Sequence, residues 1–287
     1  SKSLEMARCI YEWLAERKAE RGQAILALGG GVVGDLAGFV AATYLRGIPL
    51  VQLPTSLAAM VDAAIGGKVA VNLPAGKNLV GAFYQPRLVL ADLETLSTLP
   101  RRELAEGWAE AIKAGLILDA DLFDTMERHA EGLLALERGS TSEVIRRSMA
   151  IKARIVTQDE WETSGRRILL NYGHTIGHAL EAATGYQQYL HGEAVSVGMM
   201  GAALLSQRLG LISAQVVQRQ RQLLERFGLP LRCPGVAPRS ILRAMTLDKK
   251  VRGGALQWVV LEDVGRAVVR RRVPTALVRE VVHSLAR

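Results

Sequence analysis

The chain has 287 residues, of which 49% are hydrophobic and 22% are charged, and its formal net charge is +8. This length allows one large domain or two ordinary ones with a substantial core. Its two cysteines lie far apart, which excludes a disulfide framework and a cysteine zinc site and favours a reducing, cytoplasmic location. No apolar run reaches the roughly 18 residues of a membrane-spanning helix, so we expect no membrane partner.

The positive charge does not indicate a nucleic-acid-binding protein. Basic residues are scattered, and the strongest cluster, residues 270–272, falls at an apparent strand end without a nucleic-acid-binding motif. A pocket for an anionic small molecule explains part of the charge, and solvated surface explains the rest. The sequence also begins without a methionine inside a helical pattern, which indicates a missing upstream segment.

Residues 1–100 are expected to form an α/β domain. After a helix over residues 4–20, a short apolar run at 24–28 predicts a buried parallel strand. Gly29, Gly31 and Gly34 then fit GxGxxG between this strand and a helix through residue 44, so the backbone amides could hold a pyrophosphate. The fingerprint is incomplete, because no acidic residue closes the next strand, at 49–53, to bind a ribose hydroxyl.

Residues 54–86 are rich in glycine and proline and are expected to be a long irregular segment, followed by a strand at 88–90. Segments of this kind concentrate binding groups, although each polar residue alone would be ordinary surface. Lysine and asparagine side chains in a glycine-rich setting can bind a phosphate or diphosphate. The polar residues in question are Asp62, Lys68, Asn72, Lys77 and Asn78.

Helical periodicity dominates residues 101–287. Helices are predicted over 103–117, the 120s and 130s, 143–156, 191–208, 214–227 and 238–246, with a hairpin at 257–261 and 267–271 and a last helix from Pro274. In the first of these helices Glu110 and Lys113 share a face. They form either a surface ion pair or a metal ligand beside a substrate-facing lysine, and sequence distance does not decide between these alternatives.

Residues 167–193 contain three of the five histidines. His174 and His178 are four residues apart on a helix that starts near Gly173, so their imidazoles share one face. His191 begins a further apolar helix. Two imidazoles and a carboxylate commonly hold Zn²⁺ with one coordination position open. The alternative is that these are core or capping histidines, because an isolated HxxxH motif is not specific.

Seven motifs together carry a resemblance to a known family. They are GGGVVGDLAGFVAATYLRG, PTSLAAMVDAAIGGKVAVNLPAGKNLVGAFYQP, TLSTLP, ELAEGWAEAIKAGLI, NYGHTIGHALE, LHGEAVSVGM and LDKKVRGG. In this order they resemble the 3-dehydroquinate synthase family, within the sugar-phosphate cyclases. The resemblance implies a homodimer with a Rossmann-like, N-terminally incomplete NAD-binding α/β domain at 1–100. It further implies a mostly α-helical metal- and substrate-binding domain at 101–287.

The resemblance also implies a reaction. Members of this family convert 3-deoxy-D-arabino-heptulosonate 7-phosphate to 3-dehydroquinate and phosphate, a carbon–oxygen lyase step of the shikimate pathway of aromatic amino acid biosynthesis. The implied course is transient NAD-dependent oxidation, phosphate elimination, reduction and intramolecular aldol closure. The implied cofactors are NAD and Zn²⁺, with Co²⁺ as a substitute.

Residue roles are carried over from the family at matching positions. The metal ligands match Glu110, His174 and His191. NAD contacts match Gly31, Val32, Val33, Gly34, Asp35, Thr55, Ser56, Lys68, Lys77, Thr95, Leu96, Ser97 and Thr98. Catalytic and substrate-contacting residues match Asp62, Lys68, Asn78, Lys113, Lys152, Arg167, Asn171, His178 and, from the pair at 249–250, Lys250. Arg46 matches an arginine that reaches the neighbouring subunit's substrate phosphate.

Three alternatives are weighed against this assignment. Another NAD- and metal-dependent sugar-phosphate cyclase would change the groups around the substrate carboxylate, whereas Arg167, Asn171 and GGKVAVNLPAGKN favour dehydroquinate synthase. An NAD-linked polyol dehydrogenase would not need so many cationic residues. A truncated, non-catalytic homologue would not need to retain the metal and substrate positions. One departure from the family is an extra residue between Glu162 and Arg167.

Overall fold

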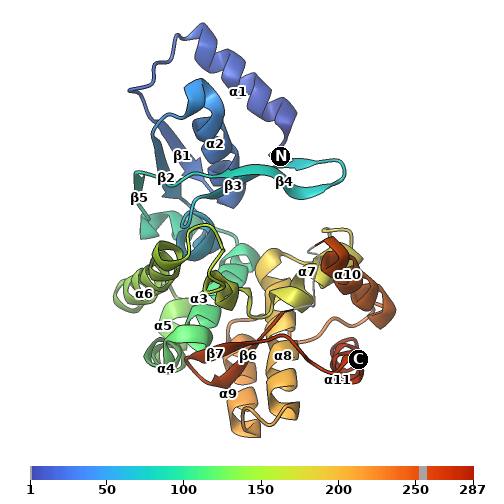
Figure 1. Ribbon diagram of the computed structural model, residues 1–287. Helices are drawn as coiled ribbons and strands as arrows, with labels where there is room; N and C mark the ends of the chain where they lie inside the picture. Colours follow the sequence, from blue (N-terminus) through green and yellow to red (C-terminus); the bar gives the residue numbers. More distant parts are fainter. Residues whose placement is uncertain (1, 252–256) are drawn as a thin grey trace. The chain divides into compact units, whose positions relative to one another are not determined.

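The computed structural model describes residues 2–251 and 257–287, without the side chains of residues 247–251 (Figure 1). The predicted substrate residue Lys250 and its neighbour Lys249 therefore have side chains outside the described residues. The chain divides into two compact units. The first contains Ser1–Leu104 and Lys152–Trp161, and the second contains Ala105–Ile151 and Glu162–Arg287.

The first unit is an α/β structure with a parallel sheet. The order of the sheet is β1-β2-β5, with Ile25 opposite Leu50 and Val51 opposite Leu88. This arrangement confirms the predicted α/β class and the parallel strands. The elements are α1 (Leu4–Glu16), β1 (Ile25–Gly29), α2 (Gly31–Thr43), η1 (Tyr44–Arg46), β2 (Leu50–Pro54), η2 (Ala59–Ala63), β3 (Lys68–Leu73), β4 (Gly76–Phe83), β5 (Leu88–Val89) and η3 (Leu93–Thr98).

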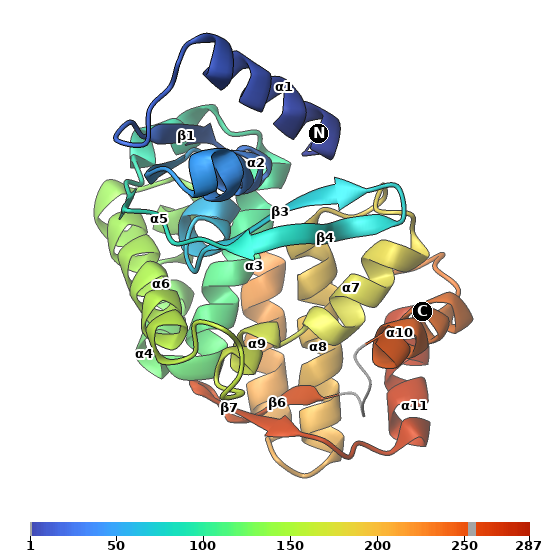
Figure 2. The same cartoon turned by 45° about the horizontal axis from the view of Figure 1, so that its top comes forward.

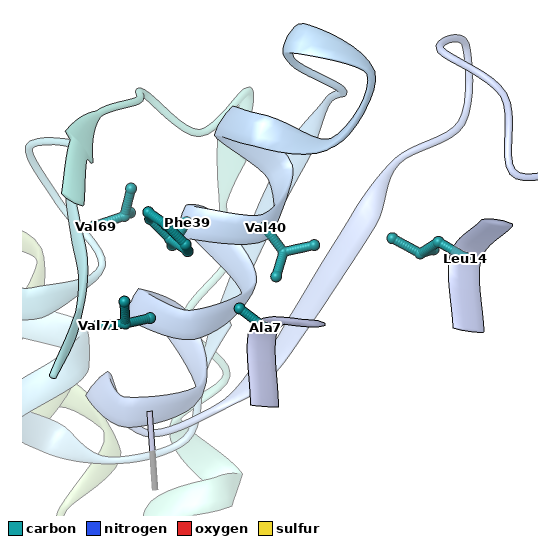
Figure 3. Packing of buried hydrophobic residues seen from close by; sticks show 6 residues of the cluster. All are labelled: Ala7, Leu14, Phe39, Val40, Val69 and Val71. Carbon is teal, nitrogen blue, oxygen red and sulfur yellow. The ribbon is translucent and has the colours of Figure 1, made fainter. Parts of the chain in front are cut away.

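Helix α2 lies at the centre of this unit's core. Figure 3 shows Phe39 of α2 beside Val69 and Val71 of β3, while Val40 faces Ala7 and Leu14 of α1. Burying such aliphatic and aromatic side chains contributes about 1.5–3 kcal/mol for each large one. Helix α2, which follows the glycine-rich turn, is thereby fixed between α1 and the hairpin β3–β4.

The prediction of a buried strand at 24–28 is wrong in one respect. In β1 only Ala27 is buried, and Leu26 and Leu28 are 62% and 65% exposed. Alternate side chains of a strand point to opposite faces of a sheet. Ala27 packs with Ala41 of α2 on one face, and the other face carries the two leucines. An unbroken apolar run therefore does not report burial on both faces.

The prediction of an irregular segment at 54–86 is also wrong. Strands β3 and β4 form an antiparallel hairpin in which Val69 pairs with Ala82 and Val71 with Val80. Because glycine is uncommon in strands, the many glycines of this segment did not indicate the hairpin. Gly81 is nevertheless required by the strand pairing. A Cβ there would lie 2.4 Å from the carbonyl oxygen of Val69, so glycine permits a close backbone approach.

The second unit is mostly helical, as predicted. In the described residues, none of its helices, and none in the other unit, is both long and apolar enough to cross a membrane. Its elements are α3 (Arg101–Leu118), α4 (Ala120–Arg128), α5 (Ala130–Leu134), α6 (Arg138–Gln158), η4 (Arg167–Asn171), α7 (His174–Ala183), α8 (His191–Arg208), α9 (Ala214–Arg226), α10 (Pro238–Val251), β6 (Trp258–Asp263), β7 (Arg266–Arg270) and α11 (Thr275–Leu285). The last turns of α6, from Lys152, belong to the first unit.

Helix α8 is the central element of the helical unit, and it contacts α7, α9, α11 and β6 (Figure 2). Its residues from Ala194 to Ala203 are all buried, so the apolar helix predicted over 191–208 is a core helix. A helix that is apolar on all sides has to be surrounded by other elements. Two predicted histidine-bearing helices thus meet in this unit, because α7 packs directly on α8.

Candidate active site

Glycines set the distance between α7 and α8. A Cβ at Gly198 would lie 1.9 Å from the carbonyl oxygen of Gly173, and a Cβ at Gly177 would lie 3.1 Å from that of Ala194. Gly173 also has φ +81°, a conformation that disfavours side chains with a Cβ. Because His174 follows Gly173 directly and His191 begins α8, this close approach brings the two histidine-bearing helix starts together.

The three predicted histidines form one cluster. Ring centroids are 5.1 Å apart for His174 and His178, 5.3 Å for His174 and His191, and 5.8 Å for His178 and His191. One ring nitrogen from each lies within 4.8 Å of the others, a spacing that could hold a metal ion. The predicted common face of His174 and His178 is confirmed. The ring of His178 lies about as close to the two predicted ligands, His174 and His191, as these lie to each other.

Glu110 of α3 faces the same cluster. Its Oε1 lies 3.8 Å from Nε2 of His174 and 3.7 Å from Nε2 of His191, while its Oε2 contacts the ammonium group of Lys113. Glu110 and Lys113 are 4% and 3% exposed, so the alternative of a surface ion pair is wrong. Oε1 is buried and has no hydrogen-bond partner among the described residues, although such an atom normally requires one.

The other ring nitrogens of these two histidines contact acceptors. Nδ1 of His174 is 3.2 Å from the carbonyl oxygen of Tyr172, and Nδ1 of His191 is 3.3 Å from Oε2 of Glu181. A proton on Nδ1 would satisfy each acceptor and leave the Nε2 lone pairs directed at Oε1 of Glu110. Burial, followed by the charges of Lys113 and the neighbouring histidines, holds the pKa of His174 well below its usual value.

The donor set fits a divalent metal. A neutral imidazole is the form that binds a metal, and two imidazoles with one carboxylate are a usual set for Zn²⁺ with an open position. The buried oxygen of Glu110 that lacks a hydrogen bond lies where such a set would need a ligand. Glu110, His174 and His191 could therefore hold the ion, with His178 beside it.

Two further carboxylates fix the first turn of α8. Oε2 of Glu193 accepts the N–H of Leu190, and Oε2 of Glu106 accepts the N–H of Gly192 at 2.8 Å. Burial raises the pKa of Glu106 against the lowering effect of this hydrogen bond. Free N–H groups at a helix start favour carboxylate acceptors. The turn that carries His191 is therefore held on both sides.

Sequence reasoning did not identify Glu106, Glu181 or Glu193. Glu181 had a detectable signal, because it is three residues after His178 and seven after His174 and so shares their helix face. Glu193 is three residues after Leu190, a spacing typical of a carboxylate that reaches back to a helix start. Glu106 had no comparable signal, since its partner is 86 residues away.

The remaining predicted residues of the helical unit lie just before α7. Arg167 and Asn171 are the first and last residues of η4, and the chain reaches His174 three residues later. Arg167 is buried, and its Nε lies 3.6 Å from Oε1 of Glu162. Glu162 has φ +56°, so the extra residue in this loop coincides with an unusual backbone conformation. Arg167 is a buried cation on the segment that leads into the histidine cluster.

In the first unit, the glycine-rich turn has the predicted form. Gly30 caps α2, so the predicted NAD contacts Gly31 to Asp35 form the first turns of this helix. Gly34 packs on Gln52 of β2, where a Cβ would lie 2.7 Å from Oε1, as expected for the glycine that permits close helix–strand packing. Thr55 follows β2, and its N–H donates to the carbonyl of Gly29. The predicted residues 31–35 and 55–56 thus lie together.

Several predicted polar residues of this unit are paired. Nζ of Lys152 lies 2.6 Å from Oδ1 of Asp62, and Lys2, which was not predicted, contacts both Asp35 and Asn78. Asp35 is largely buried, and burial raises its pKa although Lys2 acts in the opposite direction. The structure therefore brings Asp62 and Lys152 together from segments 90 residues apart.

The other predicted residues of this unit lie on β3, β4, η3 and η1. Lys68 is the first residue of β3 and Lys77 is the second residue of β4, and both are exposed. On η3 the hydroxyls of Thr95, Ser97 and Thr98 donate to carbonyls of the same segment, and Leu96 is 1% exposed. Arg46 is exposed at the end of η1, with φ +65°.

Known structures share this fold. The chain has a TM-score of 0.93 and 30% identity with ValA, a 2-epi-5-epi-valiolone synthase from Streptomyces hygroscopicus subsp. jinggangensis 5008 with NAD⁺ and Zn²⁺ bound, covering 99% of this chain and 79% of that one. With a 2-deoxy-scyllo-inosose synthase complexed with carbaglucose-6-phosphate, NAD⁺ and Co²⁺, it has a TM-score of 0.88 and 33% identity over 99% and 80% of the chains. The fold is therefore that of the dehydroquinate synthase-like sugar-phosphate cyclases.

Sequence comparisons define the family within this class. The model of the 3-dehydroquinate synthase N-terminal part matches residues 1–106, and that of the C-terminal part matches residues 107–251. A curated 3-dehydroquinate synthase from Nitrosomonas europaea is 52% identical over 283 residues, which are 99% of this chain and 76% of that protein. The chain belongs to the 3-dehydroquinate synthase family. The resemblance inferred from the seven motifs is confirmed.

Proposed function

We propose that the protein is a 3-dehydroquinate synthase that converts 3-deoxy-D-arabino-heptulosonate 7-phosphate to 3-dehydroquinate and phosphate. Curated relatives about 50% identical to the chain carry this name. The observation that carries the proposal is the convergence of Nε2 of His174 and Nε2 of His191 on the buried Oε1 of Glu110. Such a set suits a reaction that needs a divalent metal next to an oxygen-rich substrate.

Two cofactors are part of the proposal. Glu110, His174 and His191 hold Zn²⁺ or Co²⁺, and residues 31–35 with Thr55 and Ser56 hold the NAD diphosphate at the start of α2. When bound, NAD supplies a reversible hydride acceptor at substrate C5 and the metal supplies a Lewis acid for hydroxyl and carbonyl oxygens. The proposed functional division is therefore an NAD-binding part at 1–100 and a metal- and substrate-binding part at 101–287.

The chain's own charged residues bind the two anionic groups of the substrate. Lys113 and Arg167 are buried cations in the helical unit, and charge-assisted hydrogen bonds from such groups are stronger than neutral ones. Asp62 orients the ammonium group of Lys152. His178 is exposed at the edge of the histidine cluster, where it can exchange a proton with a substrate hydroxyl. Lys68, Asn78, Asn171 and Lys250 complete the proposed substrate contacts.

The test is phosphate release by the purified protein. Supplied with Zn²⁺ or Co²⁺ and NAD, it should release one phosphate for each heptulosonate phosphate consumed, and removal of either cofactor should stop the release. Parallel metal analysis and NAD titration show whether both cofactors bind. No phosphate release from a preparation that binds both would refute the proposed activity.

Another cyclase reaction is the second candidate, because the two similar solved structures above act in that group. Their 30% and 33% identity is lower than the 52% of the curated relative, which favours dehydroquinate synthase. The substrates differ in their charge, since the heptulosonate carries a carboxylate. Faster phosphate release from glucose 6-phosphate, which lacks this group, would favour the second candidate.

We also propose a cytoplasmic homodimer in which Arg46 completes the neighbouring subunit's site. Arg46 is exposed and held in a left-handed conformation, which is uncommon for a residue with a Cβ. Arg46→Ala and His191→Ala proteins should each be inactive. Mixed under conditions that exchange subunits, they should regain part of the activity, because hybrid dimers contain one complete site. Two inactive proteins that stay inactive after proven exchange would contradict the shared site.

A further inference from the structure

The two proposed histidine ligands are anchored in different ways. The Nδ1 of His174 lies 3.2 Å from a backbone carbonyl, that of Tyr172, whereas the Nδ1 of His191 lies 3.3 Å from a side-chain carboxylate, that of Glu181. Both acceptors can take a hydrogen bond from an N–H, but only the carboxylate adds a negative charge. Side-chain substitution can therefore test the anchor of His191 alone.

His191 depends more on an anchor than His174. The His191 side chain is 38% exposed and that of His174 is 12% exposed, so packing restrains the His191 ring less. Glu181 itself is buried at 7% exposure, and it lies on α7 while His191 begins α8. A buried carboxylate on α7 thus lies beside Nδ1 of a partly exposed ring on α8, where glycines bring the two helices close together.

We propose that Glu181 is a positioning residue for the metal ligand His191. It holds His191 as the tautomer with the proton on Nδ1 and orients the ring so that the Nε2 lone pair faces Oε1 of Glu110. Acceptors of this kind fix the tautomer of a ligating histidine, orient its ring and raise its basicity. This inference rests on the proposed metal site, although the tautomer of His191 can be measured without metal or substrate.

The experiment compares Glu181→Ala and Glu181→Gln with the wild-type protein. In the metal-free proteins, ¹⁵N NMR of the imidazoles reports which ring nitrogen carries the proton. We expect the Nδ1–H tautomer of His191 in the wild type, its retention in Glu181→Gln because an amide oxygen still accepts, and its loss in Glu181→Ala. The tautomer of His174, which has a backbone acceptor, should be the same in all three.

Zn²⁺ affinity, measured by competition with a chromophoric chelator, is the second readout. Losing an outer acceptor of a ligating histidine costs about 10–100-fold in metal affinity. We expect about 100-fold weaker binding for Glu181→Ala and about 10-fold weaker binding for Glu181→Gln, which keeps the hydrogen bond without the charge. Glu143→Gln, which removes a carboxylate paired with Arg146 on the surface of α6, should bind Zn²⁺ as the wild type does.

An unchanged His191 tautomer in Glu181→Ala, or Zn²⁺ affinity within about twofold of wild type in both variants, would overturn the proposal. Circular dichroism of the metal-free proteins checks folding, and the nearly isosteric Glu181→Gln decides the question if Glu181→Ala does not fold. A tautomer that changes as expected in a protein without cyclase activity would uphold the role of Glu181 and refute only the proposed function.

Discussion

The two units present their predicted functional side chains in different ways. In the helical unit Glu110, Lys113 and Arg167 are nearly inaccessible to solvent. In the α/β unit Lys68, Lys77 and Arg46 are exposed, and the glycine-rich turn offers backbone N–H groups at a helix start. A buried cluster has its geometry before any ligand binds, because packing fixes its rotamers. An exposed side chain that binds a ligand loses conformational entropy when it does so.

The two units therefore differ in where they tolerate substitutions. Interiors are close-packed, so a shift of one helix moves every ligand on it. The α/β unit instead leaves Leu26 and Leu28 on an open face of β1, and its binding groups sit on a hairpin and on helix starts. Substitutions in the helical unit should therefore affect stability together with metal and substrate binding, and those in the α/β unit should affect mainly the binding of anionic ligands.

The first prediction concerns His191 and His178, whose substitutions should have clearly different results. His191→Ala removes a proposed ligand, so it should abolish stoichiometric Zn²⁺ binding and turnover, as measured by metal analysis and phosphate release. His178→Ala should keep the metal and lose rate by about 10²–10⁴-fold, the usual contribution of a proton-transferring group. Equal metal content in wild type and His191→Ala would remove His191 from the ligand set.

The second prediction concerns the packing that positions the cluster. A Cβ at Gly192 would lie 1.9 Å from the carbonyl oxygen of Glu106, so Gly192→Ala should lower the free energy of unfolding by about 3 kcal/mol, at the upper end for overpacking. Gly139→Ala, in α6 with nothing within 4 Å of its Cβ, should raise it by about 0.5–1 kcal/mol. Urea denaturation of both variants measures the difference, and equal effects would contradict the close helix contact.

The third prediction tests the α/β unit. Lys152→Met removes a cation held by Asp62, and the loss of a charged hydrogen bond to substrate costs about 1.5–3 kcal/mol. We expect kcat/KM to fall by about 10–100-fold with unchanged Zn²⁺ content. Arg154→Met, an exposed position on the same helix, is the control and should keep kcat/KM. Loss of metal from Lys152→Met would mean that the metal site is not confined to the helical unit.

The last prediction compares the reactivity of the two thiols, one in each unit. Cys9 of the first unit is exposed, and Cys233 of the second is buried. Burial raises the pKa of the Cys233 thiol to about 11, and the thiolate is the reactive form. At pH 8 an aromatic disulfide reagent should label one thiol of the native protein quickly and two after denaturation. Rapid labelling of both in the native protein would show that the helical unit opens readily.

Much of this arrangement could be predicted from local sequence. The strand–glycine–helix order at 25–43 and the common face of His174 and His178 follow from periodicity, and the structure has both. The burial of Glu110 and Lys113 could not be predicted, because i, i+3 spacing is the same on a surface and in a core. The exposure of Leu26 and Leu28 could not be predicted either, because an apolar run does not reveal which faces of a sheet are covered.

The other features that could not be predicted depend on contacts between segments that are distant in the sequence. The pair Asp62–Lys152 joins residues 90 apart, and the hydrogen bond from Gly192 to Glu106 spans 86. Neither has a periodic signature, because such a partner is determined by helix packing. The family resemblance supplied roles for Asp62 and Lys152 but not for Glu106, which is why the carboxylates around His191 appeared only with the structure.

The contact between Lys113 and Glu110 has a consequence for the electrostatic potential of the pocket. Lys113 compensates the charge of Glu110, the carboxylate that faces His174 and His191, and an imidazole in its metal-binding form carries no charge of its own. A divalent ion bound by these three ligands would therefore not be fully neutralised by them. In a buried setting this field is weakly screened, so the same centre that binds a cation attracts a substrate with a carboxylate and a phosphate.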